Sequence, residues 1–572
     1  MVNRKIDALF GAVDISVVAQ VLARKKLVML GGAGISRDSG LPVANELTDE
    51  VLRCLGMSGK SRDEMNRAQM PFELFIETLA ACSEVAPLYE IYQQGSPCLF
   101  HHLCCKLWNS GALSAVVTTN FDALFEDAFD AEGIAYDRFW KEDDLQVWAP
   151  TNGLLPLIKL HGSAHDEPSL GSTIKRVANQ RGVRAREVAL RTAFLSGGAE
   201  LIVVAGYSGS DRFDINPALL RIASSAPPVA LIQHISENGR NAVLEPLADH
   251  PKAGPFAAFQ GIRIECDTSM LLLEMMSHNS LANALSTPDR EWHEHVLRWV
   301  THALTKHGEA FRPYACGALL KAAARPKDAQ QWFVEALSLP SSPWMRIELF
   351  LSLARCERDV GENLPRAQQS ASKALRLARK AKLIELETKA LTELGVIAAD
   401  LMQYPRALKH YKQAENLARA TSEIEKVGVC IGNAGIVRKN MGGRRRWLRA
   451  LRDYTHSIDI ARDSGDKRSE GRTIGNLGIL HSVMGNPRLA IKHFKAAAEI
   501  ARELGDAYHE AIWLVCEADD VFAVEPATAI SLVTQARHMF MPLSVARVKE
   551  CDAHLTRFST ALTPRVEKIE FS

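Results

Sequence analysis

The sequence has no apolar run long enough to cross a membrane and no excess of charge of either sign. Its longest apolar runs, such as Leu201–Ala205, are far shorter than the roughly 20 residues of a transmembrane helix. Lys and Arg total 68 against 67 for Asp and Glu, so bulk charge attracts neither nucleic acid nor an anionic membrane. The first residues, MVNRKIDALFG, lack the apolar core of a signal peptide. We expect a cytoplasmic protein without membrane association.

The cysteines lack the Cys-x-x-Cys spacing of a zinc site or redox motif. There are 11 of them, an odd number, spread from Cys54 to Cys551, which favours reduced thiols in a cytosolic protein. One dense group of potential metal ligands consists of His101, His102, Cys104 and Cys105. It lies in a helix-like stretch, where consecutive side chains point in different directions. We interpret this group as structural and expect no metal site.

Up to about residue 285, short apolar or β-branched runs alternate with longer amphipathic stretches. This alternation predicts an α/β Rossmann-like domain with a doubly wound parallel sheet. Sheets of this kind bind ligands at the carboxyl ends of their strands. The six runs that we expect to form strands are 27–30, 115–118, 157–160, 201–205, 229–232 and 262–264.

Beyond about residue 300 the pattern becomes helical and repeats. An alanine that follows a turn recurs at separations of 40, 43 and 40 residues, at Ala367, Ala407, Ala450 and Ala490. Upstream in each unit lies a small residue on a first helix, at Ala354, Gly395, Gly435 and Gly478. Small residues at fixed spacing let paired helices touch, and stacked pairs bury a continuous core. The pattern resembles the tetratricopeptide superfamily over about 345–515, with a weaker unit near 326–329.

These patterns divide the chain into four expected segments. Residues 1–285 form the α/β domain, 286–344 a helical connector with room for a first repeat, 345–560 an all-α tetratricopeptide-like solenoid, and 561–572 a tail. The solenoid is expected to bind a protein trigger or partner and to support a homo-oligomer. A purely structural or oligomerising array is the alternative, because such repeats scaffold many functions.

One dense basic run interrupts the neutral composition, at a turn between two repeat helices. It consists of Arg444, Arg445, Arg446, Arg449 and Arg452. A solvated turn or a patch for an acidic protein partner is the favoured interpretation. Contact with nucleic acid is the alternative.

Glycine-rich or polar clusters follow five of the predicted strands. The first contains Gly31-Gly32-Ala33-Gly34-Ile35-Ser36, and without a following Lys-Ser or Lys-Thr it is not a Walker A loop. Glycines there let the backbone approach a phosphate closely. The other four clusters are Thr118–Asp122, Lys159–Ser163, Gly206–Asp211 and Glu265–Asp267.

In this order the clusters resemble the sirtuin family, over about residues 20–280. The resemblance implies NAD as the substrate. Asn120 and Asp122 would then face the nicotinamide pocket, and His161 would be the catalytic histidine. The further residues that would contact NAD are Gly32, Ala33, Gly34, Ser36, Thr119, Gly206, Ser208, Cys266 and Asp267.

The sequence departs from the protein deacylases of that family in the parts that handle peptide. No cysteine lies between Cys105 and Cys266, so the zinc ribbon is absent. Pro42 is not followed by the Phe and Arg that are usual in the family. The family's Phe-Gly-Glu strand has no counterpart in this sequence. The asparagine that usually follows the fifth strand corresponds to Gln233. The cofactor elements are therefore retained and the peptide elements lost.

This combination resembles the sirtuin-like NADases of bacterial antiviral systems, which pair such a domain with a sensor or repeat domain. It implies an NAD glycohydrolase that yields nicotinamide and ADP-ribose, an abortive-infection effector regulated by its repeats. Asn120 would orient water or the ribose, Asp122 would support it, and His161 would serve as general base. Alternatives are an NAD-dependent protein deacylase or ADP-ribosyltransferase, and a non-catalytic dinucleotide-binding scaffold. In the last case Asn120 is a turn cap and His161 a satisfied strand-end histidine.

Overall fold

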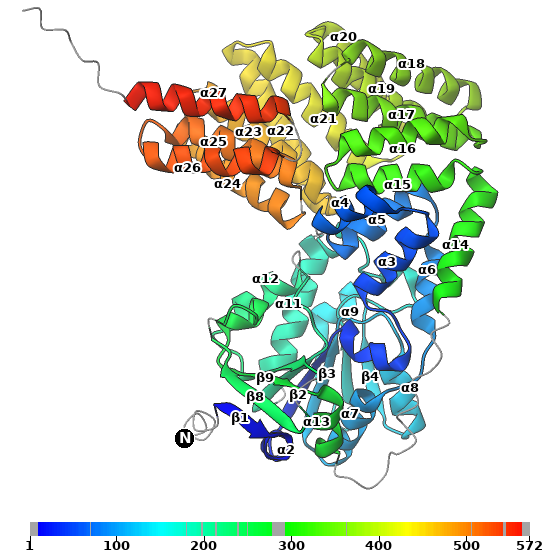
Figure 1. Cartoon of the computed structure of the whole chain (residues 1–572), viewed down its shortest axis with the longest axis vertical. Helices are drawn as coiled ribbons and strands as arrows, with labels where there is room; N and C mark the ends of the chain where they lie inside the picture. The colour runs from blue at the N-terminus through cyan, green and yellow to red at the C-terminus, as the bar shows by residue number, and fades with distance from the viewer. Residues whose placement is uncertain are drawn as a thin grey trace, which may run out of the picture. The chain divides into compact units, whose positions relative to one another are not determined.

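The chain folds into two compact units, drawn in Figure 1 from a computed structural model. The α/β unit comprises Met1–Cys54 and Glu84–Thr301, and the helical unit comprises Leu55–Ser83 and His302–Ser572. The expected boundary at 285 lies outside the described residues, as does the tail from 563, and the expected domain boundaries stay predictions. The residues that the structure describes are 10–68, 70–178, 180–195, 198–211, 214–236, 239–248, 250–276, 292–361, 363–504, 506–541 and 545–562.

The α/β unit is built on a nine-stranded sheet with the order β1-β8-β9-β7-β6-β2-β3-β5-β4. The strands are β1 (Gly11–Asp14), β2 (Leu27–Gly31), β3 (Leu113–Thr118), β4 (Tyr136–Phe139), β5 (Leu155–Lys159), β6 (Leu201–Ala205), β7 (Val229–His234), β8 (Asn241–Pro246) and β9 (Gly261–Cys266). All six predicted strands form, as β2, β3, β5, β6, β7 and β9, and each pairs in parallel with its neighbours among them.

The predicted parallel sheet forms the centre, and antiparallel strands extend it at one edge. There β8 pairs antiparallel with β9, and β1 pairs antiparallel with β8, so the sheet is mixed. The sequence also gave no sign of β4, at the opposite edge. These three strands carry polar residues and are partly exposed, so they lack the continuous apolar run of a strand buried on both faces.

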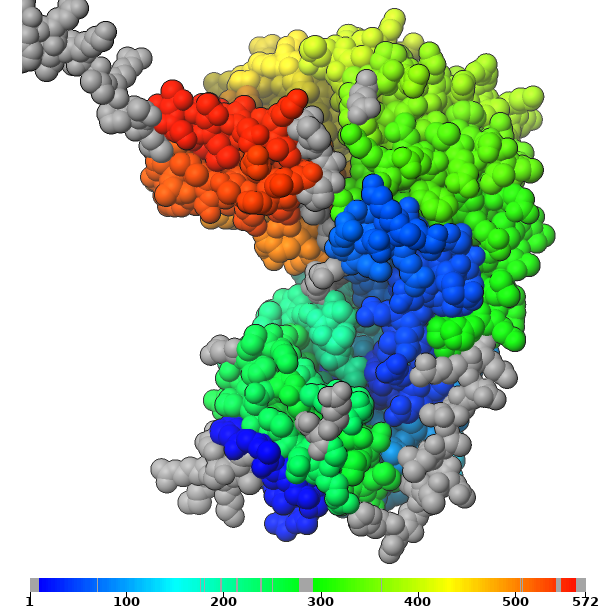
Figure 2. Space-filling view, viewed as in Figure 1, coloured from blue at the N-terminus to red at the C-terminus, as the bar shows by residue number. Residues whose placement is uncertain are grey.

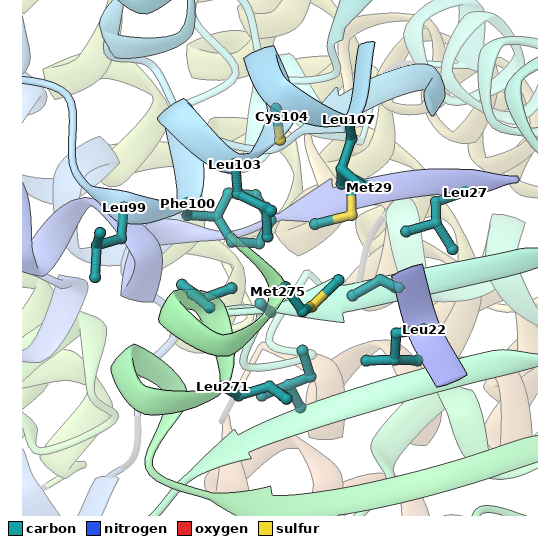
Figure 3. Close-up of a cluster of buried hydrophobic side chains, with 14 of the residues drawn as sticks. Leu22, Leu27, Met29, Leu99, Phe100, Leu103, Cys104, Leu107, Leu271 and Met275 are labelled. Carbon is teal, nitrogen blue, oxygen red and sulfur yellow. The ribbon is translucent and has the colours of Figure 1, made fainter. Parts of the chain in front are cut away.

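Helices cover both faces of this sheet. Alternate side chains of β2 point to opposite faces, Leu27 and Met29 to one core and Val28 and Leu30 to the other. Figure 3 shows the first core, where β2 meets side chains of α2, α7 and α13. The helices of this unit are α2 (Ile15–Ala23), η2 (Ala33–Ser39), α3 (Ala44–Cys54), α6 (Ala86–Tyr89), η3 (Glu90–Gln93), α7 (Leu99–Asn109), α8 (Leu124–Ala131), α9 (Glu142–Val147), η4 (Glu167–Ser169), α10 (Ile174–Val177), α11 (Gln180–Leu195), α12 (Ile215–Ile222), η5 (Gly254–Ala258) and α13 (Thr268–Met275).

The helical unit is a solenoid of paired helices, as the repeat predicts. Helix α14 (Trp292–His307) crosses the boundary between the units, and six antiparallel pairs and a final helix follow it. They are α15 (Phe311–Ala322), α16 (Pro326–Ser338), α17 (Pro343–Val360), α18 (Leu364–Ala381), α19 (Ile384–Asp400), α20 (Tyr404–Ala420), α21 (Ile424–Asn440), α22 (Arg444–Ser464), α23 (Lys467–Val483), α24 (Pro487–Glu503), α25 (Ala507–Val521), α26 (Pro526–Phe540) and α27 (Val545–Leu562). None of the described helices is both long and apolar enough to span a membrane.

In most pairs a glycine of the first helix lies against an aromatic ring of the second. A Cβ atom on Gly395 would lie 2.5 Å from the ring of Tyr411, and one on Gly478 would lie 2.7 Å from the ring of Phe494. The recurrent small residues therefore make room for these rings. The same arrangement joins Gly317 to Phe333 in α15 and α16, which extends the repeat back to the weaker unit of the sequence.

A helical hairpin from the first quarter of the chain also belongs to the helical unit. Its helices are α4 (Gly59–Ala68) and α5 (Phe72–Cys82), and α5 packs against α15. Arg325 forms an ion pair of 2.7 Å with Glu64, and the Trp332 indole donates a hydrogen bond of 3.1 Å to Ser61 Oγ. The expected first domain, 1–285, includes this hairpin, since no local pattern distinguishes its helices from those that cover the sheet.

The arginine run begins α22. All five side chains, of Arg444, Arg445, Arg446, Arg449 and Arg452, are exposed. Arg444, Arg445 and Arg446 lie in the first turn of α22, where cations oppose the helix dipole. The partner of this run stays a prediction.

The contact between glycine and ring can be tested with Gly478→Ala. The added methyl group would overlap the Phe494 ring, and such overpacking costs about 1–3 kcal/mol, more than the roughly 1 kcal/mol that alanine gains in a helix. We expect a lower urea midpoint for the helical unit, measured by circular dichroism. Adding Phe494→Leu should cost less in this variant than in the wild type; an unchanged or raised midpoint for Gly478→Ala would contradict the packing.

Candidate active site

The predicted clusters meet along one edge of the sheet. Strand β2 lies between β6 and β3. The chain continues from β2 to β3 on one side of it and later returns to β6 on the other side, so the strand order reverses at β2. A crevice opens at such a point, outside the carboxyl ends of the strands, and it is where open α/β sheets bind ligands. The loops after β2, β3, β5 and β6 therefore border one place.

Two glycine turns, after β2 and after β6, pack backbone against backbone. The amide of Gly32 donates to the Ala205 carbonyl at 3.0 Å, and the amide of Gly34 donates to the Gly206 carbonyl at 2.9 Å. Gly206 has φ +65°, and a Cβ atom on it would lie 2.4 Å from the Ile35 nitrogen. These glycines are thus required for loop packing as well as for any phosphate contact. Ala33 and Gly34 stay exposed at the crevice.

Ser36 joins the two polar residues of the next loop in a hydrogen-bond chain. The Asn120 amide donates from Nδ2 to Ser36 Oγ at 2.9 Å, and the Ser36 hydroxyl donates to Asp122 Oδ2 at 2.8 Å. Because the carboxylate only accepts, it fixes the direction of the hydroxyl, which in turn fixes the Asn120 amide. The structure thus brings together three of the predicted residues.

The side-chain amide oxygen of Asn120 takes no part in this chain of hydrogen bonds. Asn120 is buried, and its Oδ1 atom has no hydrogen-bond partner among the described residues. A buried acceptor without a partner lowers the stability of the fold by about 1–3 kcal/mol. This oxygen is therefore suited to accept a hydrogen bond from a ligand or a water molecule. Thr118, rather than Asn120, caps the turn, because the Thr118 hydroxyl accepts a hydrogen bond of 3.0 Å from the backbone amide of Asn120.

A buried ammonium group ties this loop to the loop after β5. Lys159 Nζ donates to the Asp122 carbonyl at 2.5 Å, to Glu126 Oε1 at 2.9 Å and to Ser163 Oγ at 3.2 Å. Burial raises the pKa of Asp122 above its ordinary value, although the Lys159 charge and the Ser36 hydrogen bond act in the opposite direction. The loop that carries Asn120 and the loop that carries His161 therefore both accept hydrogen bonds from the Lys159 ammonium group.

His161 is buried and pairs with a carboxylate that the sequence analysis missed. Its Nε2 atom lies 3.0 Å from Asp214 Oδ2. Arg186, also buried, approaches the same oxygen at 3.3 Å and donates at 2.8 Å to the carbonyl of Leu160. Asp214 lies just beyond the predicted cluster Gly206–Asp211, and in the sequence it is indistinguishable from an ordinary helix cap.

An aromatic wall lies beside His161. The Tyr92 and Phe121 rings meet edge to face at 5.4 Å between centroids, and the Phe121 ring lies 6.4 Å from the His161 ring. Burial, followed by the charge of Asp122, raises the pKa of Tyr92, which keeps its phenol neutral. No sequence motif indicates Tyr92, because it lies in the short helix η3 between clusters.

The other predicted residues make no hydrogen bond within this group that the described structure records. Ser208 is exposed and hydrogen-bonds to Ser210, while Cys266 is fully buried in the sheet core. Asp267 caps α13, accepting from the Met270 amide at 3.1 Å, and the Thr119 amide donates to the Gly31 carbonyl. Their contacts with NAD stay predictions. Gln233 is engaged by the Lys252 carbonyl and by Arg263.

Within the described ranges no three His, Cys, Asp or Glu residues are grouped as metal ligands would be. His101 is buried in α7, where burial lowers its pKa to about 3, and the Cys98 amide donates to its Nδ1 atom. A neutral histidine that accepts a backbone amide is a helix-capping element, as the structural interpretation expects.

Comparison with known proteins identifies part of the chain. Residues 114–237 match the family model of the SIR2-like domain. No curated protein matches the chain. This segment contains Asn120, Asp122, His161 and Asp214, so the family match covers most of the site described above.

Solved structures resemble the chain at low similarity. A Rap protein complexed with competence and sporulation factor is 15% identical and matches 47% of this chain and 80% of its own, with TM-score 0.35. NprR in complex with its peptide NprX is 16% identical, over 47% and 81%, with TM-score 0.33. Aspartyl phosphate phosphatase F from Bacillus subtilis is 13% identical, over 48% and 76%, with TM-score 0.31.

The role of the Lys159 ammonium can be measured with Lys159→Met. This change leaves Glu126 buried without its nearest cation, and breaking a buried pair costs about 3–5 kcal/mol. We expect a loss of that size in the α/β unit by chemical denaturation, partly recovered when Glu126→Gln is added. Lys25→Met, which breaks an exposed pair with Glu200, should cost no more than about 1 kcal/mol. Equal losses in both variants would argue against the buried linkage.

Proposed function

We propose that this protein is an NAD glycohydrolase that cleaves NAD to nicotinamide and ADP-ribose. A SIR2-like domain indicates NAD-related chemistry in general. The observation that carries the specific proposal is the unpartnered buried amide oxygen of Asn120, in a crevice bordered by the loop of His161. A donor from the nicotinamide ribose or from an attacking water would complete its hydrogen bonding.

NAD fits this crevice by its chemistry. The exposed backbone at Ala33 and Gly34 offers an approach for the pyrophosphate, because these two residues carry at most a methyl group. Asn120 and Asp122 would face the nicotinamide end, and the Phe121 ring would shield it from bulk water. Gly206 belongs to the turn that supports this loop, and the adenosine half would extend toward Ser208 and Asp267.

The reaction requires little from the protein besides positioning and a base. The bond between ribose C1′ and the nicotinamide nitrogen breaks, and its electron pair neutralises the pyridinium. A water oxygen bonds to C1′, and the proton that this water loses passes to His161. The sum is NAD and water giving nicotinamide, ADP-ribose and one proton. Asn120 orients the water or the ribose hydroxyl for the attack.

Removing either side chain should abolish the reaction without unfolding the protein. We expect His161→Ala and Asn120→Ala each to lower NAD consumption by at least about 100-fold, the usual contribution of a general base or an orienting group. Chromatography of the products, with and without an acetylated peptide, measures the rate and separates hydrolysis from acyl transfer.

The matched control is Asn216→Ala, which removes an amide of α12 that bonds Tyr207 and the Gly209 carbonyl. It should keep most of the activity. Wild-type rates in either of the first two variants would exclude that residue from the mechanism. Release of nicotinamide together with O-acyl-ADP-ribose in the presence of the peptide would identify a deacylase instead of a hydrolase.

We propose further that the helical unit regulates this activity. The hairpin α4–α5 supports this proposal, because it belongs to the helical unit. The chain reaches the hairpin from α3, which follows the crevice loop of η2. The chain returns at Glu84, shortly before η3, which carries Tyr92. A rearrangement of the repeats that displaces the hairpin would therefore pull on both sides of the crevice.

Reversing one charge of the hairpin tests this regulation in the full chain. Arg325→Glu places two carboxylates where Glu64 now meets a cation, and should loosen α4–α5. We expect basal NAD hydrolysis to rise at least about threefold, roughly 0.7 kcal/mol in activation free energy. Hydrogen exchange in residues 33–54 should rise with it.

Two controls accompany this variant. The double reversal Arg325→Glu with Glu64→Arg should restore the wild-type rate. Breaking the pair between Arg502 and Glu510, which joins α24 and α25 elsewhere in the helical unit, should leave residues 33–54 unchanged. Unaltered hydrolysis and exchange in Arg325→Glu would remove the hairpin from regulation.

The biological setting is proposed on the resemblance to antiviral NADases with repeat domains. An unregulated NADase would deplete the NAD of its own cell, so the resting activity must be low. We propose a cytoplasmic homo-oligomeric effector of abortive infection, whose solenoid binds a protein trigger. The exposed arginines at the start of α22 favour an acidic protein surface as part of that trigger.

A further inference from the structure

Three ionisable side chains act on the buried side chain of His161: Asp214, Arg186 and Asp211. Asp214 Oδ2 lies 3.0 Å from His161 Nε2 and 3.3 Å from Arg186 Nε. The side chains of His161, Asp214 and Arg186 are all at most 5% exposed. Asp211, from the same loop as Asp214, is close enough for its charge to act on His161. No hydrogen bond among the described residues engages the other ring nitrogen of His161, Nδ1.

The fold alone does not require this arrangement. Asp214 caps α12 by accepting from the Ile215 amide at 2.8 Å, but asparagine or serine would cap a helix equally well without a charge. Desolvating an ion pair is costly, and an apolar replacement is often as stable or more so. A buried carboxylate aimed at a histidine in a candidate active site therefore calls for a functional explanation.

We infer that Asp214 is a positioning residue, which accepts the Nε2 proton of His161 and so leaves Nδ1 as the nitrogen that receives a proton from water. Arg186 holds Asp214 in place from α11. It also donates to the carbonyl of Leu160, the residue before His161, so it fixes acceptor and histidine together. This inference rests on the proposed NAD hydrolysis and assigns the residues that prepare its base.

The two aspartates near His161 favour its protonated form. Burial opposes the charged imidazolium, but the charge of Asp214, its hydrogen bond and the charge of Asp211 outweigh it, with Arg186 opposing, so the pKa of His161 is raised. Burial alone would raise the pKa of Asp214; the charge and hydrogen bond of His161, Arg186 and the Ile215 amide instead lower it. Phe121, whose ring centroid lies 6.4 Å from that of His161, is uncharged.

The proton then has a defined course. As water attacks C1′, one of its protons passes to Nδ1, and the imidazolium carries one proton on each nitrogen. The carboxylate of Asp214 stabilises this cation without taking the Nε2 proton, as in other paired histidines. Loss of the Nδ1 proton to solvent restores the neutral ring with its proton on Nε2. No oxidant, metal or further reactant is needed.

Asp214→Asn tests the inference in the full-length protein, because the introduced amide still caps α12 but carries no charge. In protein with ¹⁵N-labelled histidine, the signal lost in His161→Ala identifies His161. We expect the wild type to carry the proton on Nε2, and Asp214→Asn to lower the pKa of His161 and change the tautomer. With NAD, kcat should fall by about 10²- to 10⁴-fold.

The pH profile separates positioning from a purely structural role. A raised pKa keeps the base protonated to higher pH, so removing the Asp214 charge should move the acid limb of kcat to lower pH. Asp214→Glu should recover part of the rate, and Asp14→Asn, at the cap of α2, should change neither rate nor profile.

Two outcomes would overturn the inference: a His161 signal with the same pKa and tautomer in Asp214→Asn, or a lower rate with an unmoved acid limb. If the wild type does not hydrolyse NAD at all, the proposed function fails. The labelled histidine still decides whether Asp214 sets the tautomer in that case.

Discussion

The ammonium group of Lys159 has no access to solvent, and its three oxygen partners come from separate parts of the α/β unit. They are the Asp122 carbonyl after β3, Ser163 after β5 and the carboxylate of Glu126 on α8. A charge in such a place must stay paired, so these loops cannot separate without exposing it. The positions of Asn120 on one loop and His161 on the other follow from this constraint.

The two aspartates nearest the crevice differ because their neighbours differ. Burial raises the pKa of Asp122, and its carboxylate orients the Ser36 hydroxyl and through it the Asn120 amide. Asp214 is equally buried, but His161 and Arg186 lower its pKa and keep it charged. One carboxylate thus orients the hydrogen-bond chain through Ser36 and Asn120, and the other balances the charge of a base.

The helical unit uses one packing device several times. A glycine on the first helix of a pair receives a ring from the second, as Gly395 receives Tyr411 and Gly478 receives Phe494. Each pair therefore approaches closely and buries a narrow core that only its neighbours complete. The hairpin α4–α5 packs on the first pair of the solenoid, where α5 contacts α15. A segment between two crevice elements is in this way built into the repeat array.

The sequence by itself determined the buried strands, the order of the polar clusters at their ends and the period of the solenoid. These features are local: an apolar run, a glycine turn or an alanine every forty residues records its own environment. Only the tertiary structure decided that β1 and β8 turn the sheet mixed, that α4–α5 joins the helical unit, and that Asp214 meets His161 across 53 residues. Edge strands and surface helices carry weak patterns, and an aspartate before a helix has the same pattern whether it only caps or also pairs. Its second partner depends on how β5, α11 and α12 pack, which no short segment encodes.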